Sequence, residues 1–539
     1  MNNTKYVLAM YDIRGKQNYI YTSNHIKEII GGSRVIADCY EDYLFPAAIA
    51  YRDGISFEEA RKCDKQAIYT YKMGDKIIEG RDFSSGAFEK RMSEEEFLGE
   101  VVYDGGGNFF VLYKDKKTCV EINKIFTKAV LQYTYSLRVL CTHIEIDNFD
   151  DYLEDRRKLY EKHAMCESKE AATIPTQVLP FTQVDYRTSM PLYKKIAIAK
   201  EPIIEKKVCK ESYCKYQKYW ELEKKNRDTF GEKILDNLVT EKGVDSHLAV
   251  IYIDGNNMGA KVQNCLKRSD GTDYTSYDDC VARLRQFSIN IQKNYIDDRM
   301  KDIDNAFAKK YSKNEKLKKR RFVIYAGDEI NFICNAKDAL MIAETYLNNL
   351  DKVDDGDGVK HSACAGIAIF HSHTPYSEAY RIAEECCESG KDRMKQKKAG
   401  DASMVDVHYC QGAIGINLEK IREKEVGELI SKPWFVTGYP EGDKTEVSLN
   451  MVKTMVEQLN QLSRSNVKGL AEVAKHSQTR LNMELSRILA HNKDVKELFG
   501  HIEDKELMRK MLYDVVILYD LWFAKEKEDN KNEQKKSHT

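Results

Sequence analysis

The stretch that most constrains the fold is Phe322–Cys334, in which two apolar segments rich in β-branched and aromatic residues flank a short acidic tip. This pattern is typical of a β-hairpin, and Gly327 supplies the backbone freedom that a tight turn needs. Asp328 and Glu329 follow the glycine as adjacent carboxylates, which repel each other unless a cation lies between them. The hairpin therefore indicates a divalent metal and a phosphate substrate or, as the alternative, a surface turn that is merely acidic.

A second motif supplies another carboxylate. The apolar run His247–Ile253 predicts a buried strand, and Asp254 stands at its carboxyl end. If this strand pairs beside the hairpin, Asp254, Asp328 and Glu329 converge. Three oxygen ligands suit Mg²⁺ or Mn²⁺, which keep water and phosphate as their remaining ligands. Two such ions could activate an attacking hydroxyl and stabilise a leaving pyrophosphate.

Together these motifs resemble the palm domain of nucleotide polymerases and cyclases. The resemblance is closest to the large polymerase-cyclase subunit of type III CRISPR effector complexes, and more distant to diguanylate cyclases. The family's Gly-Gly-Asp-Asp hairpin reads Ala-Gly-Asp-Glu at 326–329, so both acids are kept and the second is one methylene longer. The family's first metal motif commonly carries two acids two residues apart. Here Asn256 takes the second place after Asp254, which leaves the number of metal ions open.

The beginning of the chain carries a related pattern. Residues 12–20 resemble the family's Asp-x-x-Gly-x-Gln-x-(Phe/Tyr)-Ile opening, and Ser33 lies in the small-residue segment that follows. Residues 101–113 look like a second copy of the hairpin, with Gly-Gly-Gly-Asn at its tip. Asn108 lacks the charge that a metal ligand needs, so an internal duplication with a catalytically silent first palm is expected, although Asp12 remains. Its glycines would still permit close approach of backbone to phosphate.

The resemblance also assigns roles downstream. Residues 361–369 resemble the family's Ser-Ala-Gly-Ile strand, and 378–395 predicts a helix whose end should bring a lysine to the triphosphate. Lys391 fits best and Lys395 second, because a cation there would neutralise charge on the leaving phosphates. The alternative is favourable pairing with the helix dipole. The nucleotide-binding residues that the resemblance implies are Ser33, Gly255, Gly259, Gly327, Lys391 and Lys395.

Composition sets broader limits. The chain has 85 Lys and Arg against 86 Asp and Glu, so its net charge of −1 argues neither for nor against nucleic acid. The basic run 309–321 could collect triphosphate or RNA, although a solvated helix end explains it as well. A Cys-x₄-Cys pair at Cys209 and Cys214 lacks the second pair typical of zinc sites. With no signal peptide, no membrane-spanning run and 14 cysteines without framework spacing, we expect a cytoplasmic protein with reduced thiols.

We therefore expect an α+β protein built on two ferredoxin-like palm domains. The expected parts are a silent first palm at 1–146, a linker or helical insert at 147–243, a catalytic second palm at 244–404, a helical domain at 405–524 and a disordered tail at 525–539. Many family members begin with a His-Asp nuclease domain. Because the first palm starts at the amino terminus here, DNase activity from that source is not expected.

The function that the resemblance implies is a metal-dependent nucleotidyltransferase. The 3′ hydroxyl of one ATP would attack the α-phosphate of another, with Asp254, Asp328 and Glu329 holding Mg²⁺ or Mn²⁺. The products would be cyclic oligoadenylates or an adenylylated conjugate. Activation would depend on CRISPR RNA and target RNA bound through other subunits, including the small subunit of the complex. The alternatives are a non-catalytic nucleotide-binding scaffold, which Asn256 and Ala326 favour, and a stand-alone signalling cyclase.

Overall fold

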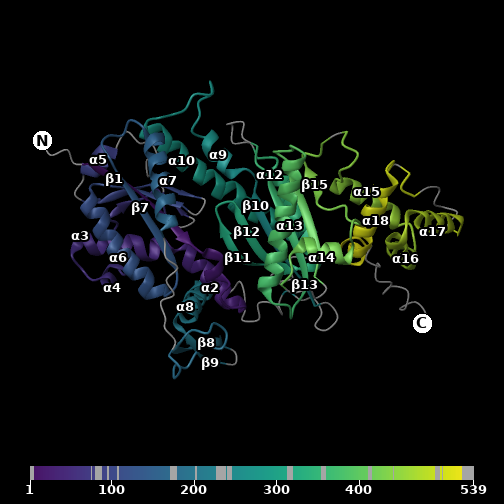
Figure 1. Cartoon of the computed structure of the whole chain (residues 1–539), viewed down its shortest axis with the longest axis horizontal. Coiled ribbons are helices and arrows are strands. Elements are labelled where there is room, and N and C mark those ends of the chain that lie inside the picture. The colour runs from purple at the N-terminus through teal and green to yellow at the C-terminus, as the bar shows by residue number, and fades with distance from the viewer. Residues whose placement is uncertain are drawn as a thin grey trace, which may run out of the picture.

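The computed structural model describes residues 5–73, 76–78, 88–93, 96–105, 108–169, 179–200, 203–225, 238, 246–311, 320–353, 360–410, 415–440, 442–491, 498–500 and 502–524. Two β-sheets with their helices lie next to each other, and the last helices form the end of the molecule opposite the N-terminus (Figure 1). This arrangement confirms the predicted α+β class with two palm-like sheets. None of the described helices has both the length and the apolar character that crossing a bilayer requires.

The first sheet has the strand order β2-β5-β6-β1-β7. Its central strand β1 runs antiparallel to β6 and β7, and successive residues point to opposite faces. Val7 and Tyr11 face a core formed with α2, α3 and α6, whereas Leu8 and Met10 face α7 and α10. The elements are β1 (Tyr6–Arg14), α1 (Lys16–Ile20), α2 (Ile26–Ala37), a helical turn (Tyr40–Leu44), α3 (Phe45–Asp53), α4 (Phe57–Ala60), β2 (Ile68–Tyr69), β3 (Lys72–Met73), β4 (Lys76–Ile77), α5 (Phe88–Ser93), β5 (Gly99–Gly105), β6 (Asn108–Tyr113), α6 (Lys116–Thr134) and β7 (Arg138–Ile146).

The second sheet has the order β11-β12-β10-β13-β14-β15, and all its neighbours are antiparallel except β13 and β14. One face of β10 packs with α12 and the C-terminal helices, and the other packs with α13. The elements are β10 (His247–Gly255), α9 (Met258–Asn264), α10 (Tyr277–Ile291), a helical turn (Gln292–Asp297), α11 (Asp298–Lys310), β11 (Arg320–Ala326), β12 (Glu329–Asn335), a short turn (Ala336–Asp338), α12 (Ala339–Leu350), β13 (Ala363–His371), α13 (Tyr376–Gln396), β14 (Ser403–Tyr409), α14 (Leu418–Glu425) and β15 (Trp434–Thr437).

The two sheets repeat one arrangement. The order β5-β6-β1-β7 corresponds to β11-β12-β10-β13, with a hairpin beside each central strand. Both hairpins carry a bulge at the same distance from the turn, between Val101 and Tyr103 in the first and between Phe322 and Ile324 in the second. The shared bulge and order support the predicted internal duplication. Residues 106–107 at the first tip lie outside the described part of the chain.

Two predicted boundaries need correction. The helical domain does not begin at 405, because β14 and β15 extend the second sheet as far as Thr437. Helices dominate only from Leu449 onward, and the tail at 525–539 lies outside the described residues. The insert at 147–243 is not purely helical, because it contains an antiparallel hairpin. The remaining elements are α7 (Tyr152–Ser168), β8 (Leu192–Lys200), β9 (Ile203–Cys209), α8 (Lys210–Lys225), α15 (Leu449–Leu459), α16 (Arg464–His476), α17 (Gln478–His491), α18 (Lys505–Leu518) and a last helical turn (Tyr519–Phe523).

The insert is packed tightly against the first palm through α8 and α2. A side chain at Gly31 would overlap the backbone carbonyl of Lys215, so the two helices approach as closely as only glycine allows. Cys209 is buried, and its thiol lies 3.4 Å from the Ser212 hydroxyl. The buried contact fits the structural interpretation of this cysteine.

A buried ion cluster joins the two palms. Helix α10 follows β10 in the chain but packs against β5, where Arg285 Nη2 lies 2.8 Å from Glu100 Oε1. Arg91 Nη2 reaches the same oxygen at 2.7 Å. Arg285 and Glu100 are fully buried, so each charge depends on the others for compensation.

Replacing Glu100 with glutamine should therefore destabilise the protein by about 3–5 kcal/mol, because two buried guanidinium groups lose their counter-charge. Urea and thermal unfolding would measure the loss. The matched control is Glu121→Gln in the exposed pair with Lys124, which should change stability by less than about 1 kcal/mol. Equal effects from both substitutions would contradict a joint that depends on this cluster.

Candidate functional site

The strand register brings the acidic residues to one end of the second sheet. Asp254 of β10 lies directly opposite Glu329 of β12, and Asp328 occupies the turn between β11 and β12. Gly327 has a φ of 64°, the left-handed conformation predicted for this turn glycine. The strand register therefore brings Asp254, Asp328 and Glu329 to the same end of the sheet.

Gly255 allows Asp328 to approach β10 closely. A Cβ atom at this position would lie 2.8 Å from Asp328 Oδ2 and 2.5 Å from the terminal methyl of Met258. Any larger residue would therefore push the carboxylate away from the strand. Asp328 comes close enough to Asp254 for the charge of Asp254 to raise the pKa of Asp328.

Burial and the repulsion of neighbouring carboxylates disfavour the ionised forms of Asp328 and Glu329. Burial, followed by the charge of Asp254, raises the pKa of Asp328 to about 7. The pKa of Glu329 is also raised to about 7, by burial and then by the charges of Asp254 and Asp328. Lys391 opposes the first shift and Lys16 the second, but neither cancels it. The cluster therefore has a strong affinity for additional positive charge.

Of the two lysines that the helix end offered, the structure brings Lys391 to the cluster. Lys391 forms an ion pair with Asp254 and lies 3.8 Å from Glu388. Lys395 pairs with Asp392 at 3.3 Å, and its side chain is largely exposed away from the acids. Gly259 is exposed on α9 with open space around it. The structure thus gives no contact of Lys395 or Gly259 with the carboxylates.

Asn256, the residue in place of the family's second acid, has a structural role. It is 1% exposed, and its amide nitrogen donates to Ser362 Oγ at 3.2 Å and to the Ala402 carbonyl at 2.9 Å. Its backbone N–H donates to the Ser362 carbonyl at 2.9 Å. Asn256 therefore fastens the end of β10 to the chain around β13 and β14 and does not point at the acidic cluster.

A cavity of about 440 Å³ separates the two palms and is lined by the acidic cluster on one side. The side chains that face it from the first palm include Ser33, which the sequence predicted, and several that the sequence did not. The first-palm lining includes Lys16, Gln17, Ser33, Glu41, Thr70, Lys72, Asp104 and Gly105, and the second-palm side includes Asp254, Met258, Phe287, Ser288, Gly327, Asp328 and Glu329.

The cavity-lining residues that the sequence analysis did not predict differ in how far a sequence pattern marks them. Lys16 and Gln17 belong to the opening motif, so the sequence marked their segment without assigning them to the site. Gln17 Nε2 donates to Tyr380 Oη at 2.8 Å, which ties the first palm to α13. Lys72 lies on a strand of two residues, pairs with Asp104 at 2.9 Å and approaches Ser288 Oγ at 3.2 Å. Its place depends on packing between the palms, which no local pattern reveals.

In the described part of the first palm, no second acid lies opposite the carboxylate of its central strand. Asp12 lies opposite Asn108, as Asp254 lies opposite Glu329 in the second palm. Asp12 is held by Arg14 at 2.8 Å and faces His163 at 3.7 Å. A single carboxylate already paired with a guanidinium is a poor ligand for a divalent metal. This geometry supports the prediction that the first palm is silent.

The fit to a divalent metal is partial. Among the described residues, no group of three or more His, Cys, Asp or Glu side chains is arranged to hold a metal ion. The predicted three-carboxylate arrangement is thus not assembled, although Asp254 and Asp328 lie together. Asp254 and Asp328 offer carboxylate oxygens, the ligand type that Mg²⁺ and Mn²⁺ prefer. These ions commonly use one or two carboxylates and complete their shell with water and phosphate.

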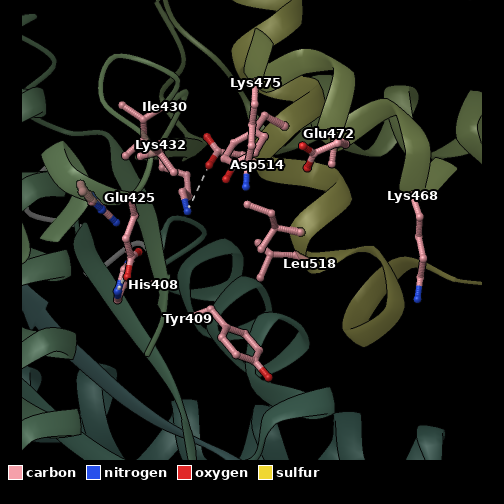
Figure 2. A pocket seen from close by; sticks show the side chains of 15 residues that line it. His408, Tyr409, Glu425, Ile430, Lys432, Lys468, Glu472, Lys475, Asp514 and Leu518 are labelled. Carbon is pink, nitrogen blue, oxygen red and sulfur yellow. Dashed lines mark ion pairs between the residues drawn. The ribbon is translucent and has the colours of Figure 1, made fainter. Parts of the chain in front are cut away.

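A second cavity, of about 310 Å³, lies between the second palm and the C-terminal helices (Figure 2). Its charged side chains largely neutralise one another. Lys432 lies 3.2 Å from Asp514, which also accepts hydrogen bonds from the backbone and hydroxyl of Ser431. Arg422 forms a two-pronged pair with Asp406. We interpret this region as a structural joint between the sheet and the helices.

The raised pKa of Asp328 gives a pH-dependent stability effect. In the unfolded chain this carboxyl ionises near its ordinary pKa, so the folded protein retains a proton between about pH 4 and 7 and loses the resulting stability as the pH rises through that window. Asp328→Asn should therefore stabilise the metal-free protein at pH 8 by about 1–3 kcal/mol and much less at pH 5.

Thermal unfolding of Asp328→Asn and wild type at both pH values would measure this difference. Glu457→Gln, at an exposed position of α15, is the control and should follow wild type throughout. Parallel stability curves for Asp328→Asn and wild type would show that the carboxyl is not under this electrostatic pressure.

Comparison with known proteins relates part of the chain to a family. Residues 247–400, which contain Asp254, Asp328, Glu329 and Lys391, match the model of the Cas10/Cmr2 second palm domain. No curated protein matches the chain.

Among solved structures, the fold resembles Csm1 of T. onnurineus, with a TM-score of 0.50 and 12% identity over 96% of this chain and 69% of that one. A Csm1–Csm4 cassette in complex with cA4 aligns with a TM-score of 0.49 and 11% identity over 96% of this chain and 70% of that one. A cassette in complex with one ATP gives 0.47 and 13% over 97% and 70%. Residues 247–400 therefore match the second palm domain of the Cas10/Cmr2 family, and the fold of the chain is similar to that of Csm1.

Proposed function

We propose that this protein is a metal-dependent nucleotidyltransferase that converts ATP into a phosphodiester product. The observation that carries the proposal is that Asp254 and Asp328 lie at the same end of the second sheet and both line a cavity of about 440 Å³ between two palms. This pair lies in the part of the chain that matches the second palm family. Charged side chains such as Asp254, Asp328 and Lys16 line the cavity together with the apolar side chains of Phe287 and Met258. This mixture suits a ligand with phosphates and an aromatic base.

The reaction is a displacement at phosphorus. The 3′ oxygen of one ATP forms a bond to the α-phosphorus of another, and the bond to the bridging oxygen breaks, so that pyrophosphate leaves with the electron pair. The hydroxyl proton passes to water. A divalent ion held by Asp254 and Asp328 would lower the pKa of the hydroxyl and neutralise charge on the phosphates.

The side chains around the cluster support this chemistry. Lys391 forms an ion pair with Asp254, so a cation already stands beside the carboxylate that would hold the metal ion. Lys16 enters the same cavity from the first palm and offers a cation to the phosphates. The apolar side chains of Phe287 and Met258 also line the cavity, where they could cover the base and exclude water.

We propose further that the activity serves a type III CRISPR effector complex. The product would be a cyclic oligoadenylate or a related adenylylated compound. CRISPR RNA, target RNA and the small subunit would act through neighbouring subunits, as the family resemblance implies. A second candidate is a nucleotide-binding scaffold without turnover. The incomplete metal-ligand set among the described residues and the structural role of Asn256 favour this candidate.

The test is incubation of the protein, with its co-purifying subunits and RNA, with labelled ATP and Mg²⁺ or Mn²⁺. Mass spectrometry should find a phosphodiester product that Asp328→Ala/Glu329→Ala reduces by at least about 100-fold, since removing a group that stabilises charge at the reacting centre costs about 10²–10³ in rate. Asp12→Asn, the equivalent position in the first palm, is the matched control and should retain activity. ATP binding without any product would leave the scaffold.

A second prediction concerns the approach of Asp328 to β10. Gly255→Ala should lower turnover about 100-fold in a folded protein, because a displacement of about 1 Å at a reacting centre has a cost of this size. Gly469→Ala, in α16 and with open space around its Cβ position, is the control and should be neutral. If both substitutions were neutral, the contact between Gly255 and Asp328 would have no part in catalysis.

A further inference from the structure

The insert exposes an unusual amount of apolar surface. Phe181, Tyr186 and Ile203 are 82%, 78% and 75% exposed. In the described part of the chain, most of the large apolar side chains that solvent reaches lie within 179–204. They are Leu179, Phe181, Val184, Tyr186, Tyr193, Ile203 and Ile204. A concentration of this kind is typical of a surface that a partner covers.

The segment is firmly held, so its exposure is not that of a loose loop. The indole N–H of Trp220 donates to the Ala197 carbonyl at 2.7 Å, and Lys27 Nζ donates to the Ile198 carbonyl at 2.9 Å. Both acceptors belong to β8, so side chains from α8 and α2 occupy carbonyl groups of this strand. Ile196 and Ile198 pack against a hydrophobic core that α2, α8 and the second palm share. Figure 1 shows the hairpin projecting from the body below α8 and α2.

The other strand of the hairpin has an open edge. Within the described residues, β9 pairs with β8 alone. Its first five residues, 203–207, are all exposed, so solvent reaches both of its faces. An exposed edge presents backbone N–H and C=O groups to which another strand can add, and proteins usually protect such edges.

The charged side chains on this hairpin surface are mostly lysines. Lys195 and Lys207 lie directly opposite each other across the hairpin, an arrangement that is unfavourable for like charges. Lys194 and Lys206 are exposed beside them, and within the described chain Lys195, Lys206 and Lys207 have no ion pair. Glu205 is the one acid among the exposed residues of β9. A ligand that brings carboxylates to these lysines would relieve the repulsion.

We propose that β9 is a docking strand to which an extended segment of a partner protein, with alternating apolar and acidic residues, adds as a third strand. On β9 itself the exposed apolar side chains, Ile203 and Ile204, are aliphatic, which favours a peptide strand over RNA along this edge, because bases stack on aromatic rings. Backbone hydrogen bonds to β9 would supply affinity. Contacts of acidic residues with Lys195 and Lys207 would supply specificity.

The experiment uses the full chain and a fluorescein-labelled peptide of about eight alternating valine and glutamate residues as the probe. Fluorescence anisotropy should show binding of this peptide, and hydrogen exchange should show new protection at 203–209. The counter-probes are a peptide of alternating valine and lysine and a single-stranded oligouridylate.

The decisive variant is Lys207→Glu. It should weaken binding of the acidic peptide about fivefold, the effect of losing a surface charge contact. It should also leave the protein at least as stable as wild type, because it converts the repulsive pair with Lys195 into an attractive one. Loss of binding through misfolding is therefore separable from loss through charge. Lys505→Glu, at an exposed position of α18, is the control and should bind as wild type does.

Three outcomes would overturn the proposal. The basic peptide would bind as well as the acidic one, or the acidic peptide would bind without protecting β9. In the third outcome, the oligouridylate would bind in place of the acidic peptide and lose affinity in Lys207→Glu, which would reassign the surface to RNA.

Discussion

The repulsion among Asp254, Asp328 and Glu329 is the constraint on which the rest of the structure depends. The register of β10 with β12 fixes two of these carboxylates opposite each other, and Gly255 lets the third come close. Such an arrangement costs free energy in a folded protein, because burial and like charge both oppose ionisation. A folded protein tolerates this cost only where nearby cations offset the repulsion among the carboxylates. Lys391 supplies one from the second palm and Lys16 another from the first.

The same constraint explains why two palms are needed to make one site. In the described part of the first palm, Asp12 is engaged by Arg14, and Asn108 stands opposite it where the second palm has Glu329. From this palm Lys16, Lys72, Glu41 and Asp104 line the shared cavity, and Lys72 pairs with Asp104. The buried cluster of Arg91, Glu100 and Arg285 fixes the distance between the two halves. Each palm thus contributes a different set of charged side chains to the one cavity.

The sequence was sufficient for features that local pattern determines. The hairpin, the strand before Asp254 and the helix that carries Lys391 all follow from periodicity and turn chemistry, and the structure gathers these residues. Features that depend on packing were out of reach. Lys72 and Ser288 enter the site from elements far apart in the chain, and Asn256 turned inward to hydrogen bonds that no motif indicates. The predicted end of the second palm at residue 404 was wrong because the short strands β14 and β15 were not recognised in a region where the amino-acid composition changes.

Asn256 and Lys391 together explain how the site departs from a motif with two acids on β10. A second carboxylate in place of Asn256 would lie at a position that is 1% exposed, among the Ser362 and Ala402 contacts, where an amide can donate two hydrogen bonds and a carboxylate none. The asparagine thereby keeps β10 joined to its neighbours and removes one negative charge from the cluster. Asp254 is left with Lys391 as its immediate counter-charge, so any metal must compete with that lysine for the same carboxylate. Metal affinity in this protein should consequently depend on substrate, because phosphates can draw Lys391 away from Asp254 and supply the missing oxygen ligands themselves.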